Sequence, residues 1–288
     1  MTRLPTPQAR HRARALMGCM LLMAAAGHTA QAAPEQPLWE VGLGAAALHF
    51  PAYRGSDQGQ GLLLPVPYLV YRGDFFKVDR DGVRAQLFDS DRVELTFSGA
   101  LSPPASTRDV RARAGMPDLR ATFEVGPQLD LTLWQAQRRG TTLKLLLPVR
   151  AAFTLEQRPQ HVGWVFHPKL NLDVAHVAGL AGWNLGLQAG PLWGDRRQHN
   201  HFYSVATPYA TGERPAYAAA AGFGGMQYVV GVSKRYPNHW VGAFLRYDNL
   251  NGARFVNSPL VRTRHHVAAG VAVSWVLGSS ATRVAVDD

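Results

Sequence analysis

Residues 128–153 read QLDLTLWQAQRRGTTLKLLLPVRAAF, and this stretch decides the fold. Leu129, Leu131 and Leu133 alternate with polar residues in its first part, and the second part repeats the alternation. Because successive side chains of a β-strand point to opposite faces, each part predicts a strand with one apolar and one polar face. The polar segment 135–140 ends in a glycine and predicts the turn that joins the two strands into a hairpin.

Each arm of this hairpin has about ten residues, which is the length that a tilted strand needs to cross the hydrocarbon core of a membrane. The hairpin therefore fits a transmembrane β-barrel. A half-buried strand pair in a soluble β-sandwich has the same pattern, so one hairpin leaves both folds open. The rest of the chain has to decide between them.

The alternation recurs after residue 33 and predicts about twelve strands. These are residues 39–50, 62–71, 74–79, 83–88, 93–101, 118–134, 141–153, 162–176, 183–193, 217–235, 240–250 and 263–277. Pro65 and Pro67 lie inside the second of them, and because proline cannot donate to a ladder we expect that strand to be irregular or locally unpaired there. Tryptophans near many strand ends are typical of the aromatic girdles of membrane barrels.

The connections support a barrel with both ends on the periplasmic side, because an even number of strands alternates short inner turns with longer outer loops. The outer connections fall at 51–61, 80–82, 102–117, 155–161, 195–216 and 251–262. The inner ones fall at 72–74, 89–91, 135–140, 177–182 and 236–239. Only 80–82 is a short outer connection. The sequence therefore predicts an all-β fold, an antiparallel transmembrane β-barrel of about 12 strands, with about 10 or 14 as alternatives.

Residues 1–32 differ in kind from the rest of the chain. Arg3, Arg10, Arg12 and Arg14 form a basic start, residues 15–27 are an apolar run, and Ala30-Gln31-Ala32 has the small-x-small pattern read by signal peptidase. This order predicts a Sec-type secretory signal peptide cleaved after Ala32, which leaves residues 33–288 as the barrel domain, with its last strand ending near residue 277.

Two consequences follow from removing the signal peptide. The only cysteine, Cys19, is lost, so disulfides, thiol catalysis and cysteine metal sites are excluded in the mature chain. The net charge falls from +10 to +6, and the remaining arginines are scattered. An exported chain meets no nucleic acid, so anionic lipopolysaccharide or peptidoglycan is the acidic neighbour that this charge favours. The mature chain also has no run of about 18 apolar residues, which excludes a spanning helix.

Several short segments, in this order along the chain, resemble the MipA/OmpV family of outer-membrane proteins. They are Pro51-Ala52-Tyr53-Arg54-Gly55-Ser56, Leu64-Pro65-Val66-Pro67-Tyr68, Gly115-Met116-Pro117-Asp118-Leu119, Gly126-Pro127, Leu147-Pro148-Val149-Arg150, Gly190-Pro191-Leu192-Trp193, Phe202-Tyr203-Ser204-Val205 and Ser258-Pro259-Leu260-Val261. The resemblance implies a barrel in the cell outer membrane, in contact with outer-membrane lipid. For some members it implies a scaffold that joins a murein-degrading lytic transglycosylase to a murein-synthesising penicillin-binding protein. Other members of the family are associated with adhesion or with a response to stress and antibiotics, and the resemblance implies these roles as alternatives.

The chain departs from outer-membrane barrels at its end. Such barrels commonly finish on an aromatic residue that the assembly machinery reads, whereas this chain continues from Gly278 to Asp288. Trp275 or Leu277 is the internal residue that we expect to replace that signal.

Catalytic and metal sites are poorly supported. Ser258 lies near His265 and His266 in the sequence, which leaves an outer-membrane lipid hydrolase as a remote alternative. A dyad needs a base within hydrogen-bond reach, and no Gly-x-Ser-x-Gly elbow is present. His199 and His201 have no nearby third ligand, so they make a weak metal site. The sequence therefore predicts no enzyme, no catalytic residue, no cofactor and no metal.

The residues expected in the lumen bear on the two remaining functions, a scaffold and a small channel. Charged residues of both signs are expected to face inward: Glu40, Glu94, Glu124, Asp130, Lys144, Arg150, Lys169, Asp173 and Arg246. Unpaired charges in a narrow lumen are costly, so mixed signs favour pairing and hence a scaffold. Because murein enzymes are reached from the periplasm, the candidate partner contacts are Arg138 and Arg139 in the inner turn of the central hairpin, with an unpaired tail at 282–288 on the same side.

Overall fold

The computed structural model describes residues 35–72, 76–79, 82–85, 88–90, 92–136 and 140–285. The chain divides into two compact units, one of residues 36–284 and one of residues 1–35 with 285–288. The first unit carries the fold and is described by itself. The signal peptide expected at 1–32 and the end of the chain at 286–288 lie outside the described residues.

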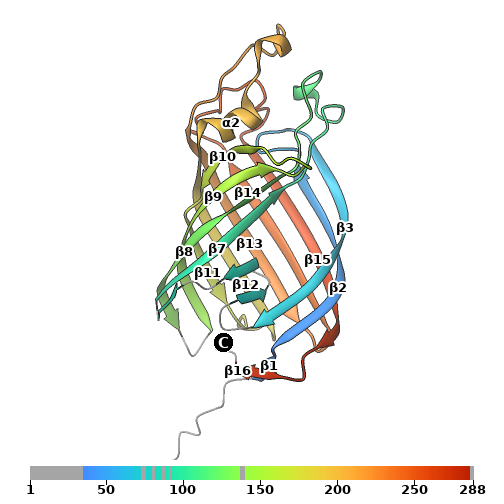
Figure 1. The fold of residues 1–288 in the computed structure, drawn as a ribbon, viewed down its shortest axis with the longest axis vertical. Helices are drawn as coiled ribbons and strands as arrows, with labels where there is room; N and C mark the ends of the chain where they lie inside the picture. The colour runs from blue at the N-terminus through green and yellow to red at the C-terminus, as the bar shows by residue number, and fades with distance from the viewer. Residues whose placement is uncertain are drawn as a thin grey trace, which may run out of the picture. The chain divides into compact units, whose positions relative to one another are not determined.

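Fourteen strands of this unit form one antiparallel sheet (Figure 1). In chain order they are β2 (Trp39–Pro51), β3 (Gly59–Arg72), β4 (Phe76–Asp79), β5 (Gly82–Ala85), β6 (Phe88–Asp89), β7 (Val93–Ser102), β8 (Thr122–Ala136), β9 (Thr141–Thr154), β10 (His161–Phe166), β11 (Lys169–Val174), β12 (Trp183–Gly194), β13 (Gly222–Arg235), β14 (His239–Asn249) and β15 (His265–Ser279). Each strand pairs mainly with its neighbours in the sequence, and β15 pairs with β2.

The sheet closes into a barrel. Its path begins at β5 and ends at β6, and both strands lie against β7, so that together they act as one interrupted strand. In the same way β10 and β11 both lie between β9 and β12. With each of these two pairs counted as a single wall segment, the described residues form a barrel of twelve segments. The prediction of an antiparallel barrel of about 12 strands is confirmed.

The central hairpin forms as the alternation predicts. In β8 and β9, Leu131 pairs with Leu145 and Leu129 with Leu147, so their side chains share one face. Asp130 and Arg150 on the other face are buried. A bulge at Thr132/Trp134 shifts the register at the inner end of β8, and it leaves Leu133 as the extra residue.

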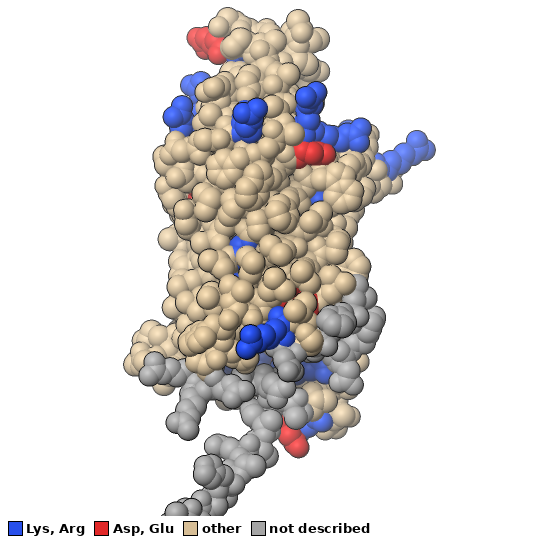
Figure 2. All heavy atoms as spheres, turned by 90° about the vertical axis from the view of Figure 1, so that its left-hand side faces the viewer, with Lys and Arg blue, Asp and Glu red and all other residues tan. Residues whose placement is uncertain are grey.

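The two faces of the sheet differ in polarity in β2, β3 and β7–β15, the strands whose side chains the structure describes. Large apolar side chains point outward, and Leu63, Leu101 and Leu277 have exposed fractions of 75%, 76% and 74%. Figure 2 shows the result on one side, where a broad belt has almost no charged residue at its surface and Lys and Arg gather above it. Exposed Trp39, Trp134, Trp164 and Trp275 lie near strand ends and confirm the expected aromatic girdles at those positions. An apolar belt between such girdles is the surface that a bilayer solvates.

Prolines explain the irregular parts of the wall. Pro65 and Pro67 pair with Ala45 and Leu43 of β2 without a break, while among the described residues the other edge of β3 pairs only at Tyr71 and Arg72. The strand is thus regular on one edge and unpaired on the other at these positions. Pro168, which has no N–H, separates β10 from β11 where the sequence predicted a single strand over 162–176.

Two strand starts, the content of one connection and the pairing of the tail differ from the prediction. The strands predicted at 118–134 and 217–235 begin at Thr122 and Gly222, because the residues before them belong to the outer connections. The connection at 195–216 contains an α-helix, α2 (Arg196–Tyr203), whose N-cap Asp195 accepts a hydrogen bond from the backbone N–H of Gln198. The tail expected to be unpaired from residue 282 instead contains β16 (Arg283–Ala285), which pairs with β1 (Glu35–Pro37).

The long connections lie at one end of the barrel, where Figure 1 shows α2. They join β2 to β3, β7 to β8, β9 to β10, β12 to β13 and β14 to β15. Long connections of outer-membrane barrels face the outside, so this end is the outer end. Among the described residues, no helix has the length and apolar composition needed to cross a membrane.

Candidate functional site

Four outer connections pack into a compact body, which we call the cap. They are residues 52–58, 103–121, 195–221 and 250–264. Their apolar side chains form one buried cluster: Tyr53, Ala105, Val110, Met116, Leu119, Tyr203, Val205, Ala219, Leu250, Ala253, Phe255 and Leu260. Loops that merely surround an open pore do not need such a core, so the cap is a folded element in its own right.

An aromatic stack lies at the centre of the cap. The rings of Tyr203 and Phe255 are parallel within 7° with centroids 3.5 Å apart, and His199 of α2 meets Phe255 edge-on at 4.8 Å. The hydroxyl of Tyr53 donates a hydrogen bond of 2.7 Å to the carbonyl oxygen of Leu260. Burial raises the pKa of Tyr53 to about 12 and also raises the pKa of Tyr203, because the charged phenolate would lose its water.

Long polar side chains join the connections to one another. Arg113 donates to the carbonyl oxygen of Phe202 at 3.1 Å, and Arg214 donates to the carbonyl oxygens of Ala112 and Ala114 at 3.1 and 2.8 Å. Each bond joins residues 103–121 to residues 195–221. The cap is therefore held by hydrogen bonds to backbone carbonyls as well as by its core.

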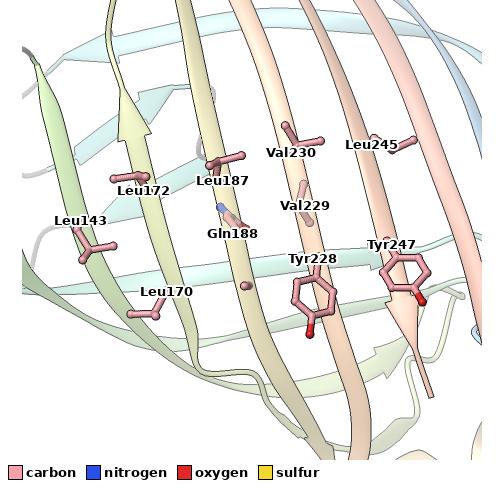
Figure 3. A pocket seen from close by; sticks show the side chains of 11 residues that line it. Leu143, Leu170, Leu172, Leu187, Gln188, Tyr228, Val229, Val230, Leu245 and Tyr247 are labelled. Carbon is pink, nitrogen blue, oxygen red and sulfur yellow. The ribbon is translucent and has the colours of Figure 1, made fainter. Parts of the chain in front are cut away.

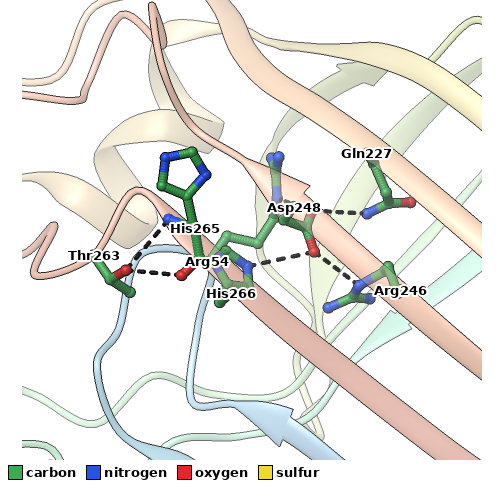
Figure 4. Close-up of polar contacts among 7 residues, drawn as sticks. All are labelled: Arg54, Gln227, Arg246, Asp248, Thr263, His265 and His266. Atoms are coloured by element: carbon green, nitrogen blue, oxygen red, sulfur yellow. Dashed lines mark hydrogen bonds and ion pairs between the residues drawn. The ribbon is translucent and has the colours of Figure 1, made fainter.

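A buried charge cluster lies below the cap, on the lumen face (Figure 4). The Asp248 carboxylate is fully buried and accepts from Arg54 Nε at 2.8 Å, Arg246 Nε at 2.9 Å and Gln227 Nε2 at 3.1 Å. His266 Nε2 lies 3.4 Å from the same carboxylate. Arg54 belongs to the connection after β2, so this cluster ties the cap to β13, β14 and β15.

A second cluster surrounds a buried carboxylate at the opposite, inner end of the lumen. Glu40 at the start of β2 is 4% exposed and pairs with Arg235 at 2.7 Å and with Arg72 at 3.4 Å. Tyr68 donates to Glu40 at 3.1 Å and is also hydrogen-bonded to Arg235. Arg235 comes from β13, and β14 and β15 lie between β13 and β2 in the sheet. The ion pair between Arg235 and Glu40 therefore passes over two intervening strands on the lumen side.

The charges expected to face the lumen all have polar partners. Arg150 pairs with Glu124 at 2.9 Å, and Lys144 lies 3.8 Å from Glu94. The others bond to neutral or opposite groups: Gln128 donates to Asp130, Asn171 to Asp173, and Lys169 to Gln188, while Arg246 and Glu40 belong to the two clusters above. The predicted pairing of opposite charges is therefore observed for six of these nine residues, whereas Asp130, Lys169 and Asp173 are hydrogen-bonded to side-chain amides.

The residues of the remote hydrolase alternative are not brought together. Ser258 is buried in the cap, where its hydroxyl donates to the carbonyl oxygen of Tyr203 at 2.6 Å. His266 faces the lumen beside Asp248, whereas His265 is exposed and its Nδ1 lies 2.7 Å from the hydroxyl of Tyr247. Because adjacent residues of a strand face opposite sides, the two histidines cannot share one nucleophile.

The two histidines of α2 pack inside the cap. Nδ1 of His199 lies 2.7 Å from the carbonyl oxygen of Ala220, and burial lowers its pKa. Burial also lowers the pKa of His201 to about 4, with the positive charge of Arg113 adding to the effect. No three His, Cys, Asp or Glu side chains gather as metal ligands in the part of the chain that the structure describes.

The glycine-rich segment 222–225 gives room for close packing. Gly225 has a φ of 102°, and a Cβ there would lie 2.5 Å from the carbonyl oxygen of Asn249. Arg138 and Arg139, the predicted partner contacts, lie outside the described residues. Their flanking residues Ala136 and Thr141 pair at the end opposite the cap.

Sequence reasoning missed the apolar core of the cap. It placed Glu40 and Arg246 in the lumen but did not predict the partners that they meet in the two clusters. Asp248 was detectable, because it lies two residues from Arg246 and therefore on the same face of β14. The connection 250–264 contains Leu250, Phe255 and Leu260 among many polar residues. These large apolar side chains within a long loop were the only signal in the sequence for a core in the cap.

The architecture defines a class of protein: a β-barrel of the outer membrane whose outer connections form a folded cap and whose lumen charges are paired. Comparison with known proteins identifies the family. A model of the MltA-interacting protein MipA family matches residues 43–277, and the chain belongs to this family. It is 26% identical over 214 residues to outer membrane protein Omp26La of Vibrio anguillarum, covering 71% of this chain and 75% of that protein.

Solved structures with a related outline have low similarity. An outer membrane channel from Pseudomonas putida F1 matches with a TM-score of 0.44 and 10% identity, over 87% of this chain and 100% of that one. The outer membrane protein OprG from Pseudomonas aeruginosa matches with a TM-score of 0.22 and 8% identity, over 85% of this chain and 95% of that one.

Proposed function

We propose that this protein is a closed, non-catalytic barrel that serves as a scaffold for murein enzymes at its periplasmic end. One observation carries the proposal: a buried carboxylate paired with arginines lies at each end of the lumen, and a cap with its own apolar core lies beyond the outer one. A barrel stabilised in this way offers partners a rigid platform instead of a path for solutes.

The energetics of the two clusters support a closed barrel over a small channel. In both clusters an arginine lies against a buried carboxylate, Arg54 against Asp248 and Arg235 against Glu40, so the negative charges that could attract a cation into the lumen are already neutralised. Removal of Arg54 would leave the fully buried Asp248 carboxylate with less compensation, and breaking such a buried ion pair costs about 3–5 kcal/mol, whereas the pair of Glu40 with the more exposed Arg235 is worth less. Conducting pores instead bind their ions weakly enough to release them.

The family description supports the choice of partner, because it names an interaction with MltA. The resemblance of the sequence points to the same class, a lytic transglycosylase, together with a penicillin-binding protein. Such enzymes meet the barrel from the periplasm. Arg138 and Arg139, between β8 and β9, are the candidate contacts because they form the most basic inner connection of the sequence.

Capture from cells tests the scaffold. Wild-type protein cross-linked in the envelope should co-purify with a lytic transglycosylase and a penicillin-binding protein, and R138E/R139E should weaken that capture most at low salt, where surface charges are least screened. The matched control is R196E/R197E, which reverses an adjacent and exposed arginine pair at the outer end. Equal capture by both variants and the wild type would remove Arg138 and Arg139 as contacts.

Conductance in planar bilayers tests the closed lumen separately. The wild-type barrel should give no stable single-channel steps at moderate voltage. Stable steps of uniform size would favour the small channel, which is the competing function.

Loss of capture after removal of the outer loops alone would place the function on the exterior of the cell.

A further inference from the structure

A hollow in the outer wall of the barrel has no role in the proposed function. It has a volume of about 390 Å³ and crosses β9, β11, β12, β13 and β14 (Figure 3). Its lining is almost wholly apolar and includes Leu170, Leu187, Val230 and Leu245, all on the lipid-facing side. The hollow therefore opens toward the membrane and not toward the lumen.

A small residue in a row of large ones creates the hollow. Ala189 of β12 pairs with Leu170 of β11 on one side and with Tyr228 of β13 on the other, and Tyr228 pairs in turn with Tyr247 of β14. These four side chains share the outward face because directly paired residues of antiparallel strands point the same way. The methyl group of Ala189 leaves a gap that its neighbours border but do not fill.

The outer end of the hollow carries polar groups. In Figure 3 the hydroxyls of Tyr228 and Tyr247 both point toward the end at which β14 finishes, which is the outer end. The Tyr247 hydroxyl lies 2.7 Å from Nδ1 of His265, whose Nε2 lies 3.2 Å from the side-chain nitrogen of Asn251. The Tyr228 ring is 41% exposed, so its hydroxyl is accessible to a ligand from the bilayer.

Two exposed arginines lie at the rim above these tyrosines. The backbone carbonyl of Arg264 accepts from Leu250 N at 2.8 Å, just beyond β14, and Arg254 N donates to the carbonyl oxygen of Phe223 at 2.8 Å, beside the outer end of β13. Neither guanidinium forms an ion pair with a described residue. Free cations at the membrane surface attract anionic lipid head groups.

We propose that this hollow is a binding site for the lipid A part of lipopolysaccharide, with one acyl chain over Ala189 and the glucosamine phosphates at Arg264 and Arg254. Each part of the site matches one part of this ligand. The apolar floor takes the hydrocarbon, the tyrosine hydroxyls meet the acyl linkages, and the arginines meet the phosphates. The site does not depend on the scaffold role, because it lies on the lipid-facing wall and not at the periplasmic end.

Native mass spectrometry of the full chain in detergent tests this site, with purified lipid A as the probe and phosphatidylethanolamine as the comparison. The wild-type protein should retain one lipid A and little phosphatidylethanolamine. A189F fills the hollow and should lower lipid A retention at least tenfold. The matched control is A47F, which adds the same ring at an exposed, outward position of β2. It should behave as the wild type.

Charge reversal tests the head-group end. R264E should lower lipid A retention severalfold, whereas R108E, at an exposed arginine of the connection between β7 and β8, should not. A heat-modifiability assay on gels verifies that each variant is a folded barrel. Unchanged retention in A189F, or equal retention of phosphatidylethanolamine by the wild type, would overturn the proposal. A wild-type dimer that A189F abolishes would overturn it too, since a second copy would then fill the hollow.

Discussion

Replacement of Phe255 by alanine should loosen the cap while leaving the barrel intact. Phe255 is 1% exposed, stacks on Tyr203 with ring centroids 3.5 Å apart and contacts His199 edge-on. A fully buried phenylalanine that becomes alanine costs about 3–5 kcal/mol, part of which is the aromatic contact. Because about 1.36 kcal/mol is a factor of ten, opening of the cap should become more frequent by about 10²-fold to about 5 × 10³-fold.

Hydrogen exchange measured by mass spectrometry is the assay. Amides of residues 195–221 and 250–264 should exchange faster in F255A, whereas those of β13 and β14 should keep the wild-type rate. The control is L155A in the connection between β9 and β10, where Leu155 is 61% exposed and its loss should change stability by at most about 0.5 kcal/mol. Wild-type exchange in F255A, or an equal increase in L155A, would refute the claim that the cap has a core of its own.

The structure makes two further predictions and the sequence makes a third. The pKa of His201 is lowered from 6.5 to about 4, so the opened cap binds a proton that the closed cap does not, and the stability present above pH 6.5 should be lost as the pH falls toward 4. Protection factors of α2 amides at pH 7 and pH 5, with the pH dependence of intrinsic exchange divided out, measure this, and equal protection at the two pH values would contradict it. L145R should destabilise the folded barrel by up to about 2–4 kcal/mol, because Leu145 faces lipid, and K144A should cost less. Urea unfolding in lipid vesicles compares the two variants, and equal costs would mean that the register is wrong. Mass spectrometry of the mature protein from outer-membrane fractions should find an N-terminus at Ala33, and an intact residue 1 would disprove cleavage after Ala32.

The wall of the barrel was predictable because its signal is local. A period of two fixes which side chains of a strand share a face, so Leu131 and Leu145 could be assigned to lipid, and Asp130 and Lys144 to the lumen, from the sequence alone. The side on which the five long connections lie followed from counting strands. Errors arose where a connection borders a strand, as at Thr122 and Gly222, because the pattern alone does not show where pairing ends.

The pairing of lumen charges was predictable in kind but not in detail. The mixed signs of Glu124 and Arg150 indicated that inward charges would neutralise one another. Which residues meet depends on how far one strand is displaced along its neighbour and on the curvature of the sheet. Arg235 therefore reaches Glu40 over two intervening strands, a contact that no local pattern encodes.

The alternation of residues along each strand thus determined the barrel, its lipid-facing surface and its two ends. Only the tertiary structure decided the cap, the Asp248 and Glu40 clusters and the hollow at Ala189. Tyr53 and Leu260 meet in the cap although 207 residues separate them, and Arg54 meets Asp248 across 194 residues. Such contacts exist only after the sheet has closed and brought β2 beside β15. Closure is a property of the whole chain, whereas the period of a strand is already present in ten residues.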